Sequence, residues 1–247
     1  MQNDIDINQF NDISWQSALK AGKEQLGNLD VNLRFLEKTL CFKTNDRILE
    51  LGCGIGTIVH WLSQKGCHAF GSDISKTAVE YGRQKYPGIA LTVESAEELN
   101  WKDGEFDSVL SFDVFEHLFG IDKHLREVAR VLKPNGCYLF QTPNKYSNVL
   151  FETLRSRSLQ WKYYHPSLHT PRQLKKRLLK HNFTVRFIKM NPVTPFFLKK
   201  LQRLPILVWL VKKIPFQNLP LCLQTNLYVV AQKKLDDAVP VEIAEKS

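Results

Sequence analysis

The stretch Arg47-Ile-Leu-Glu-Leu-Gly-Cys-Gly-Ile-Gly-Thr57 decides the fold. Its apolar beginning, from Ile48 to Leu51, is typical of a short parallel strand that is covered on both faces. Three glycines follow at alternate positions, and residues 57–65 then have the pattern of a helix. A strand, a glycine turn and a helix in this order let bare backbone approach a ligand, because a Cβ would occupy the space of the ligand and because such turns often need a positive φ.

A second strand, expected at residues 67–72, brings Asp73 to the same edge of the sheet. In this topology an acidic residue at the end of the second strand accepts the hydroxyls of a ribose. The dinucleotide fingerprint G-x-G-x-x-G would place its third glycine at Thr57, whereas here that glycine stands at position 56. The sequence therefore predicts a site for an adenosine cofactor without a pyrophosphate.

The motif Glu50-Leu-Gly-Cys-Gly-Ile-Gly56 resembles the first motif of class I S-adenosylmethionine-dependent methyltransferases. The resemblance covers roughly residues 30–190 and continues through Val114-Phe-Glu-His-Leu-Phe119, which is similar to the branch that includes the ubiquinone-biosynthesis O-methyltransferases and related small-molecule methyltransferases. It implies S-adenosylmethionine as the cofactor and S-adenosylhomocysteine as its product. The cofactor-binding residues that it implies are Glu50, Gly52, Cys53, Gly54, Gly56, Asp73, Ile74, Ala96, Glu97, Phe112 and Asp113.

The chain departs from this resemblance after the third expected strand. The resembling enzymes carry a D-A-x-x-L pattern there and use it to bind the adenine. Ser95 stands where their Asp does, which leaves a hydroxyl and backbone amides for recognition, with Ala96 and Glu97 as neighbours of the adenine.

Strands that alternate with helices predict an α/β fold with a doubly wound, mainly parallel, seven-stranded Rossmann-like sheet. Its last two strands, expected at residues 183–190 and 223–232, form the antiparallel pair that ends such sheets, with an inserted cap between them. We expect residues 1–12 to be loose and one helix from Trp15 to about Leu40, which either covers the cofactor or packs on the sheet edge.

This pattern predicts four parts of the chain. An N-terminal helical segment (1–40) precedes the methyltransferase domain (41–190 and 222–235), an insertion interrupts that domain (191–221), and a charged tail ends the chain (236–247).

The charge of the chain is divided unevenly. The formal net charge is +9, yet residues 153–235 carry 17 lysines and arginines and no Asp or Glu, so that the remainder has a net charge of −8. Such an uneven distribution of charge indicates what kinds of partner the protein binds, and it does not indicate the fold. Within it, residues 191–221 alternate apolar blocks with lysine pairs, which fits either a cap over the substrate pocket or an interfacial element that meets anionic head groups.

The cysteines and the termini indicate a cytoplasmic setting, with peripheral membrane contact as an alternative. The N-terminus is polar and acidic, unlike a secretory signal, and no apolar run reaches the length of a spanning helix. The five cysteines are scattered without a C-x-x-C pair, so we expect reduced thiols and no structural zinc site; they are Cys41, Cys53, Cys67, Cys137 and Cys222.

His117 is the candidate catalytic base, because it follows the fourth expected strand on the cofactor side. A capping or supporting histidine is the alternative. Asp113, Glu116 and His117 also match the place where some quinone O-methyltransferases carry an E-x-x-E-H metal cluster, with Asp as the first acid here. A bound divalent ion is therefore an alternative that we do not favour.

His165 and His169 lie four residues apart, but Pro166 disfavours the regular helix that would align them as a zinc pair. A histidine in the loop that closes over the methyl acceptor is the better interpretation. Tyr146, like the aromatic residues around position 163, could contact an acceptor or simply pack.

The first functional hypothesis is O-methylation of a lipophilic or anionic small molecule. The second is an RNA methyltransferase whose basic third follows phosphates. Against it, the lysines alternate with aliphatic residues, and Thr142-Pro-Asn144 is not the N-P-P-[YF] type of motif that amino-methylating enzymes use. The third is a non-catalytic protein that keeps the cofactor fold. The oligomeric state is not predicted.

Overall fold

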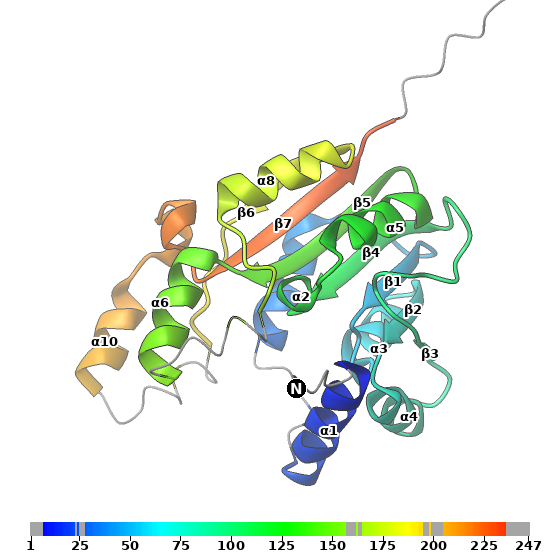
Figure 1. The fold of residues 1–247 in the computed structure, drawn as a ribbon, viewed down its shortest axis with the longest axis horizontal. Coiled ribbons are helices and arrows are strands. Elements are labelled where there is room, and N and C mark those ends of the chain that lie inside the picture. Colours follow the sequence, from blue (N-terminus) through cyan, green and yellow to red (C-terminus); the bar gives the residue numbers. More distant parts are fainter. Residues whose placement is uncertain are drawn as a thin grey trace, which may run out of the picture.

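The structure is a computed structural model that describes residues 7–22, 24, 28–156, 162, 165–194, 198 and 205–235. One seven-stranded sheet organises these residues, in the order β3-β2-β1-β4-β5-β7-β6, with helices on both faces (Figure 1). The first five strands in this order run parallel, whereas β7 is antiparallel to both β5 and β6. The predicted doubly wound sheet with an antiparallel last strand is confirmed.

The strands lie close to the positions expected from the sequence, and all but the 12-residue β5 are short. They are β1 (Arg47–Leu51), β2 (His68–Asp73), β3 (Ala90–Val93), β4 (Phe106–Phe112), β5 (Leu132–Pro143), β6 (Phe183–Ile188) and β7 (Asn226–Lys233).

The helices follow the alternating pattern of the sequence. The α-helices are α1 (Ile7–Lys20), α2 (Leu29–Thr39), α3 (Thr57–Gln64), α4 (Lys76–Lys85), α5 (Ile121–Val131), α6 (Lys145–Ser156), α8 (Pro171–Lys180) and α10 (Pro205–Lys213). The described residues also form the short 3₁₀ helices η1 (Phe115–His117), η2 (Phe216–Asn218) and η3 (Leu221–Leu223).

The prediction of one N-terminal helix from Trp15 to Leu40 is wrong, because the structure has two helices, α1 and α2. The first begins at Ile7, so the expectation of a loose segment up to residue 12 is also wrong from that residue onward. Gly22 has a φ of +67° just after α1, the left-handed conformation with which glycine commonly ends a helix. The two helices then pack on different surfaces: α1 contacts α4, whereas α2 buries Phe35 and Leu36.

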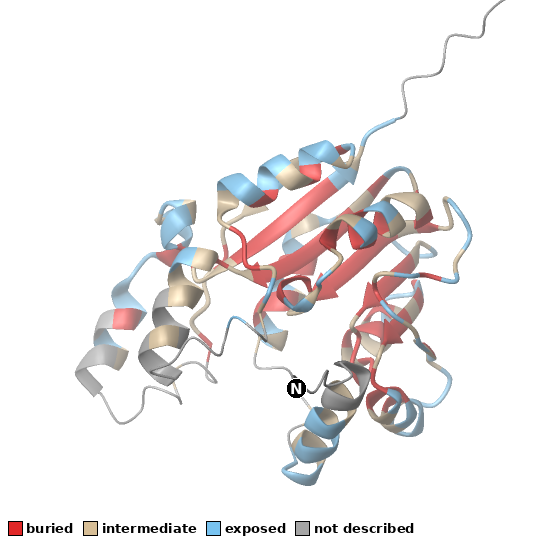
Figure 2. Cartoon of the chain, in the orientation of Figure 1, coloured by how far each residue is buried: buried red, intermediate tan, exposed pale blue. Residues whose placement is uncertain are grey.

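Two apolar clusters form the core, and different helices contribute to each cluster. One cluster holds the apolar sides of α5 and α8, and the other holds those of α2 and α3. The central strands are buried along nearly their whole length (Figure 2). This is the pattern expected of a parallel sheet covered on both faces, and it leaves the carboxyl ends of the strands as the place for a site.

The insertion between β6 and β7 is described only in part. As its prolines predict, it contains short helical pieces: α10 begins at Pro205 and η2 follows Pro215. Phe196, its neighbouring lysines and the tail 236–247 lie outside the described residues. No helix in the described part of the chain is long and apolar enough to cross a membrane.

Candidate active site

The glycine loop between β1 and α3 needs its glycines for both conformation and space. Gly52, Gly54 and Gly56 have φ values of +67°, +53° and +76°. A Cβ on Gly52 would lie 2.2 Å from a methyl carbon of Val114, and one on Gly54 would lie 2.5 Å from the ring of Trp15. Any larger residue would therefore be strained and would collide with its neighbours.

Asp73 closes this loop from the end of β2. Its Oδ2 accepts a hydrogen bond from the backbone N–H of Gly54, and its Oδ1 accepts one from Ser75, both at 2.8 Å. Burial raises the pKa of Asp73, although the two backbone hydrogen bonds act in the opposite direction. A carboxylate oxygen can accept more than one hydrogen bond, so both oxygens keep a lone pair for the hydroxyls of a ribose.

Glu50 lies beneath the loop at the end of β1. It is only 2 % exposed, and its Oε2 has no hydrogen-bond partner in the described part of the chain. Burial, with the neighbouring Asp73, raises its pKa well above the usual value. A buried polar atom without a partner is uncommon in a native fold, and it fits a site whose ligand or ordered water completes the hydrogen bonding.

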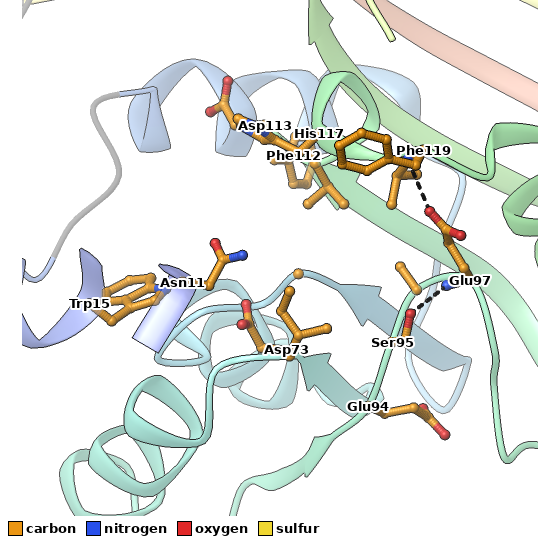
Figure 3. A pocket seen from close by; sticks show the side chains of 15 residues that line it. Asn11, Trp15, Asp73, Glu94, Ser95, Glu97, Phe112, Asp113, His117 and Phe119 are labelled. Atoms are coloured by element: carbon orange, nitrogen blue, oxygen red, sulfur yellow. Dashed lines mark hydrogen bonds between the residues drawn. The ribbon is translucent and has the colours of Figure 1, made fainter. Parts of the chain in front are cut away.

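A cavity of about 430 Å³ opens beside the glycine loop at the carboxyl ends of β1, β2 and β4 (Figure 3). The predicted residues that line it are Gly52, Asp73, Ile74, Ala96, Glu97, Phe112, Asp113 and the candidate base His117. Cys53, Gly54 and Gly56 belong to the adjacent loop, where Gly56 is the N-cap of α3 and Cys53 is buried. Residues far apart in sequence are thus brought to one cavity, and their individual roles remain predictions.

Helix α1 supplies two residues of the cavity wall that sequence reasoning missed. They are Asn11 and Trp15. The helix is fastened by Asp12, whose Oδ1 accepts hydrogen bonds from Ser75 Oγ at 2.6 Å and from the backbone N–H of Thr77 at 3.0 Å. This attachment lies two residues from Asp73, so α1 covers the cofactor side of the cavity. The remaining unpredicted lining residues are Glu94, Val114, Leu118 and Phe119.

Glu97, which lines the cavity, binds the backbone of the neighbouring loop through its side chain. Its Oε1 accepts hydrogen bonds from the backbone N–H groups of Phe119, at 3.1 Å, and Gly120, at 2.9 Å (Figure 3). Gly120 is the N-cap of α5, so this carboxylate fixes the loop between η1 and α5. The hydroxyl of Ser95, in turn, accepts a hydrogen bond from the Glu97 backbone.

Asp113 ends β4 in a conformation that is unusual for a residue other than glycine. Its φ is +55°, its backbone N–H donates to Gln141 Oε1 at 3.0 Å, and its carboxylate accepts from Asn28 Nδ2 at 3.2 Å. Burial raises the pKa of this carboxyl group. Strained backbone that the surroundings hold in place is common at functional sites, and here it turns the chain into η1.

Glu116 and His117 follow on η1. Glu116 is buried, and its Oε2 accepts a hydrogen bond from Thr142 Oγ1 at 3.1 Å. Burial, together with the nearby Asp113, raises the pKa of Glu116 to about 8, so that this carboxyl group is protonated at neutral pH. His117 is half exposed, with its Nε2 4.0 Å from Glu116 Oε1.

The two loop histidines contact different partners. The ring of His165 lies 5.0 Å from that of His117, centroid to centroid, whereas His169 packs edge-on against Phe115 at 5.7 Å. Among the residues that the structure describes, no three His, Cys, Asp or Glu side chains converge as metal ligands. All five cysteines are free thiols.

Comparison with known proteins indicates which class of enzyme the chain resembles. Residues 49–140 match the family described as "Methyltransferase domain". The chain is 34 % identical over 98 residues to a "Probable S-adenosylmethionine-dependent methyltransferase" of Mycobacterium tuberculosis, covering 40 % of this chain and 36 % of that protein. It is 33 % identical over 108 residues to the "Ubiquinone biosynthesis O-methyltransferase" of Chelativorans sp., covering 42 % and 43 %. The chain thus spans less than half the length of these relatives.

Solved structures share the fold over most of the chain. The methyltransferase in complex with the Haloferax volcanii Trm112 methyltransferase activator has a TM-score of 0.69 at 17 % identity, covering 90 % of this chain and 98 % of that one. Haemonchus contortus phosphoethanolamine N-methyltransferase 2, solved with S-adenosylmethionine, has a TM-score of 0.60 at 23 % identity, covering 83 % and 52 %.

Residues 49–140 therefore match a methyltransferase domain, and over them the chain is similar to S-adenosylmethionine-dependent methyltransferases, whose fold it shares. S-adenosylmethionine is the cofactor that this similarity supports. The positive-φ glycine loop, the ribose-side Asp73 and the unpartnered Glu50 oxygen all fit this cofactor.

Proposed function

We propose that the protein transfers the methyl group of S-adenosylmethionine to an oxygen atom of a lipophilic or anionic small molecule, with His117 as the proton acceptor. One observation carries the proposal: His117 borders the same cavity as Gly52 and Asp73. Figure 3 shows Asp73 on one side of the opening and Phe112, Asp113 and His117 on the other.

Bound S-adenosylmethionine supplies an electrophilic methyl carbon on a sulfonium. The residues of the chain have to position the acceptor and to remove its proton. Positioning alone is worth on the order of 7–11 kcal/mol in well-oriented reactions, and a base adds roughly 10²–10⁴-fold for a hydroxyl acceptor. The acceptor oxygen bonds to the methyl carbon, the carbon–sulfur bond breaks, and the acceptor proton passes to Nε2 or Nδ1 of His117.

Glu116 shapes the surroundings of this base. The carboxyl group of Glu116, which is protonated at neutral pH, lies 4.0 Å from His117 Nε2, and the charge of His117 also acts on the carboxyl group of Asp113. The ring of His165 lies 5.0 Å from that of His117. Within the cavity, His117 and the exposed ring of Phe119 offer polarisable and apolar surface to an acceptor.

The described part of the insertion supports a lipophilic acceptor that is held at a membrane. Trp209 of α10 is 56 % exposed, and Lys213 lies 3.7 Å above its ring. Ile214 is also exposed. Exposed aromatic and aliphatic side chains beside lysines are the composition of interfacial segments that contact anionic head groups.

Methyl transfer from labelled S-adenosylmethionine into a total cell extract tests the proposal. The products are separated into organic, aqueous small-molecule, RNA and protein fractions, with His117→Gln as a matched variant. Label in the organic or small-molecule fraction that is lost with the variant supports the proposal. Label in RNA would contradict the proposal and would indicate that the basic residues of the last third of the chain bind RNA phosphates. Cofactor binding without any label would favour a non-catalytic protein.

A further inference from the structure

A second cavity, of about 600 Å³, lies away from the methyltransferase site, between α8 and the N-terminal ends of α5 and α6. The proposed base His117 and the predicted cofactor-binding residues do not line it, whereas His169, from the loop expected to close over the methyl acceptor, does. Its lining residues are Asp122, Lys145, Leu168, His169, Gln173, Lys176, Arg177, Leu179 and Lys180.

One face of α8 makes most of this wall. Lys176 and Arg177 are adjacent, and each lies three or four residues from both Gln173 and Lys180, which places the four on the same face of a helix. The opposite face of α8 buries Leu174 and Leu178 against the sheet. The basic side chains therefore cannot turn away into the core, and Lys145 faces them from α6.

The positive charge of the cavity is only partly balanced. Asp122 is the one acid among the described residues that line it, and this carboxylate already accepts a hydrogen bond from His181 Nε2 at 2.6 Å and pairs with Arg177 at 3.3 Å. In the described part of the chain, Lys145, Lys176 and Lys180 form no ion pair with an acidic side chain. Like charges at these helical spacings repel one another, so an anion that bound among them would be stabilised.

The hydrogen-bonding groups of the cavity wall also favour an anionic ligand. Gln173, which also lines the cavity, accepts a hydrogen bond from the backbone N–H of Thr170 at its Oε1 and has its NH₂ group as a donor. The three lysines and Arg177 also present only donors. The wall thus combines donors and positive charge, which complement the acceptor oxygens of a phosphate group with its charge of about −1.5 to −2 at neutral pH.

We propose that this cavity binds the phosphate or diphosphate group of a phosphorylated ligand. The group is either part of a free phosphate ester or the head group of a phospholipid. A hollow between α8 and the ends of α5 and α6 suits one discrete phosphate better than a continuous nucleic acid backbone, which needs an extended groove or stripe of charge.

The position of the cavity links it to the methyltransferase site. The segment 165–169 separates the two: the backbone N–H of Ser167 donates to the carbonyl of Glu116 at 3.1 Å, and the ring of His169 packs on Phe115. On the other side, the backbone N–H of Lys145 donates to the carbonyl of His169 at 3.1 Å. A bound phosphate would therefore hold the segment that backs η1, which carries His117.

Calorimetric titration of the full chain with inorganic pyrophosphate tests the site. The pocket variant is Lys176→Glu with Lys180→Glu, and the control is Arg172→Glu with Lys175→Glu, which makes the same change of charge on exposed residues of the same helix outside the cavity. We expect saturable binding that the pocket variant weakens by about tenfold or more, since charge-assisted hydrogen bonds are lost, while the control stays within about twofold. Circular dichroism checks that both variants remain folded.

Equal weakening by both variants would show a general electrostatic effect and would overturn the proposal. So would the lack of pyrophosphate binding to the unaltered chain, or binding of an RNA oligonucleotide through these lysines without pyrophosphate competition. A second titration with vesicles that contain phosphatidic acid separates the two sources. Displacement of pyrophosphate by the vesicles supports a phospholipid head group, and saturable pyrophosphate binding that they leave intact supports a free ester.

Discussion

Asp73 and Gly54 are joined by a hydrogen bond of 2.8 Å from the Gly54 backbone N–H to Asp73 Oδ2. The bond fastens the glycine loop after β1 to the end of β2, nineteen residues further along the chain. The carboxylate that we expect to bind the ribose and the backbone of the glycine loop are therefore joined, and a change in either should disturb the binding of the same cofactor.

Gly54→Ala tests the close approach of the loop. We expect it to lower the affinity for S-adenosylmethionine and to destabilise the fold, because the new Cβ would meet the ring of Trp15 at a positive φ. The strain alone costs on the order of 1 kcal/mol. Gly104→Ala is the control, since Gly104 also has a positive φ but has no atom within 4 Å of the Cβ position. Equal effects of both changes on affinity would refute a role for the close approach.

Asp12→Ala tests the attachment of α1. The change removes the acceptor of Ser75 Oγ and of the Thr77 backbone N–H, so α1 should leave the cavity more often. We expect weaker cofactor binding and faster proteolysis within residues 7–22, while the melting temperature of the sheet changes little. Asp30→Ala, on the first turn of α2, is a suitable control. Unchanged cofactor affinity with a released α1 would mean that the helix is no part of the site.

His117→Gln tests the proposed base. We expect kcat to fall by about 10²–10⁴-fold for a hydroxyl acceptor, with little change in cofactor affinity, because the imidazole would act on the acceptor proton only. His68→Gln, at the exposed amino end of β2, controls for the loss of any histidine. Activity that survives in His117→Gln at every pH would leave His117 a supporting role.

Glu116→Gln tests the protonation of this buried carboxyl group. Its pKa is about 8 in the folded protein and about 4.5 in an unfolded chain, so the folded state binds more protons between these values. The stability that this group contributes is therefore complete below about pH 4.5 and is lost as the pH rises towards 8. Relative to Glu116→Gln, the free energy of unfolding of the unaltered protein should fall by up to about 1.4 kcal/mol per pH unit in this window. Denaturant titrations from pH 5 to pH 8 measure it, and parallel curves would contradict the protonation.

Local sequence patterns predicted the sheet and the cofactor loop well, because both depend on short-range chemistry. Apolar runs of the length of Ile48–Leu51 specify buried strands, and the glycine spacing with Asp73 specifies the turn. Helix α8 likewise begins with residue types that favour a helix start, since Thr170 is its N-cap and Pro171 stands in its first turn.

Local sequence patterns could not predict the long-range contacts. The apolar positions from Trp15 to Leu40 continue at helical spacing through Gly22, so periodicity alone did not reveal that α1 and α2 pack on different surfaces. The place of Trp15 against Gly54 depends on that packing. The basic cavity beside α8 was also missed, since Lys145 and the α8 lysines meet only in the folded chain. Their spacing on one helical face was the signal that could have been used.

Calorimetric titration with S-adenosylmethionine tests the central claim most directly, with the unaltered chain compared with Asp73→Asn and with Asp103→Asn, an exposed acid outside the cavity. We expect one cofactor per chain, an affinity that Asp73→Asn weakens by on the order of 10–100-fold through lost charge-assisted hydrogen bonds, and no change in Asp103→Asn. Undiminished binding in Asp73→Asn, or no binding to the unaltered chain, would contradict the assignment of this cavity to the cofactor.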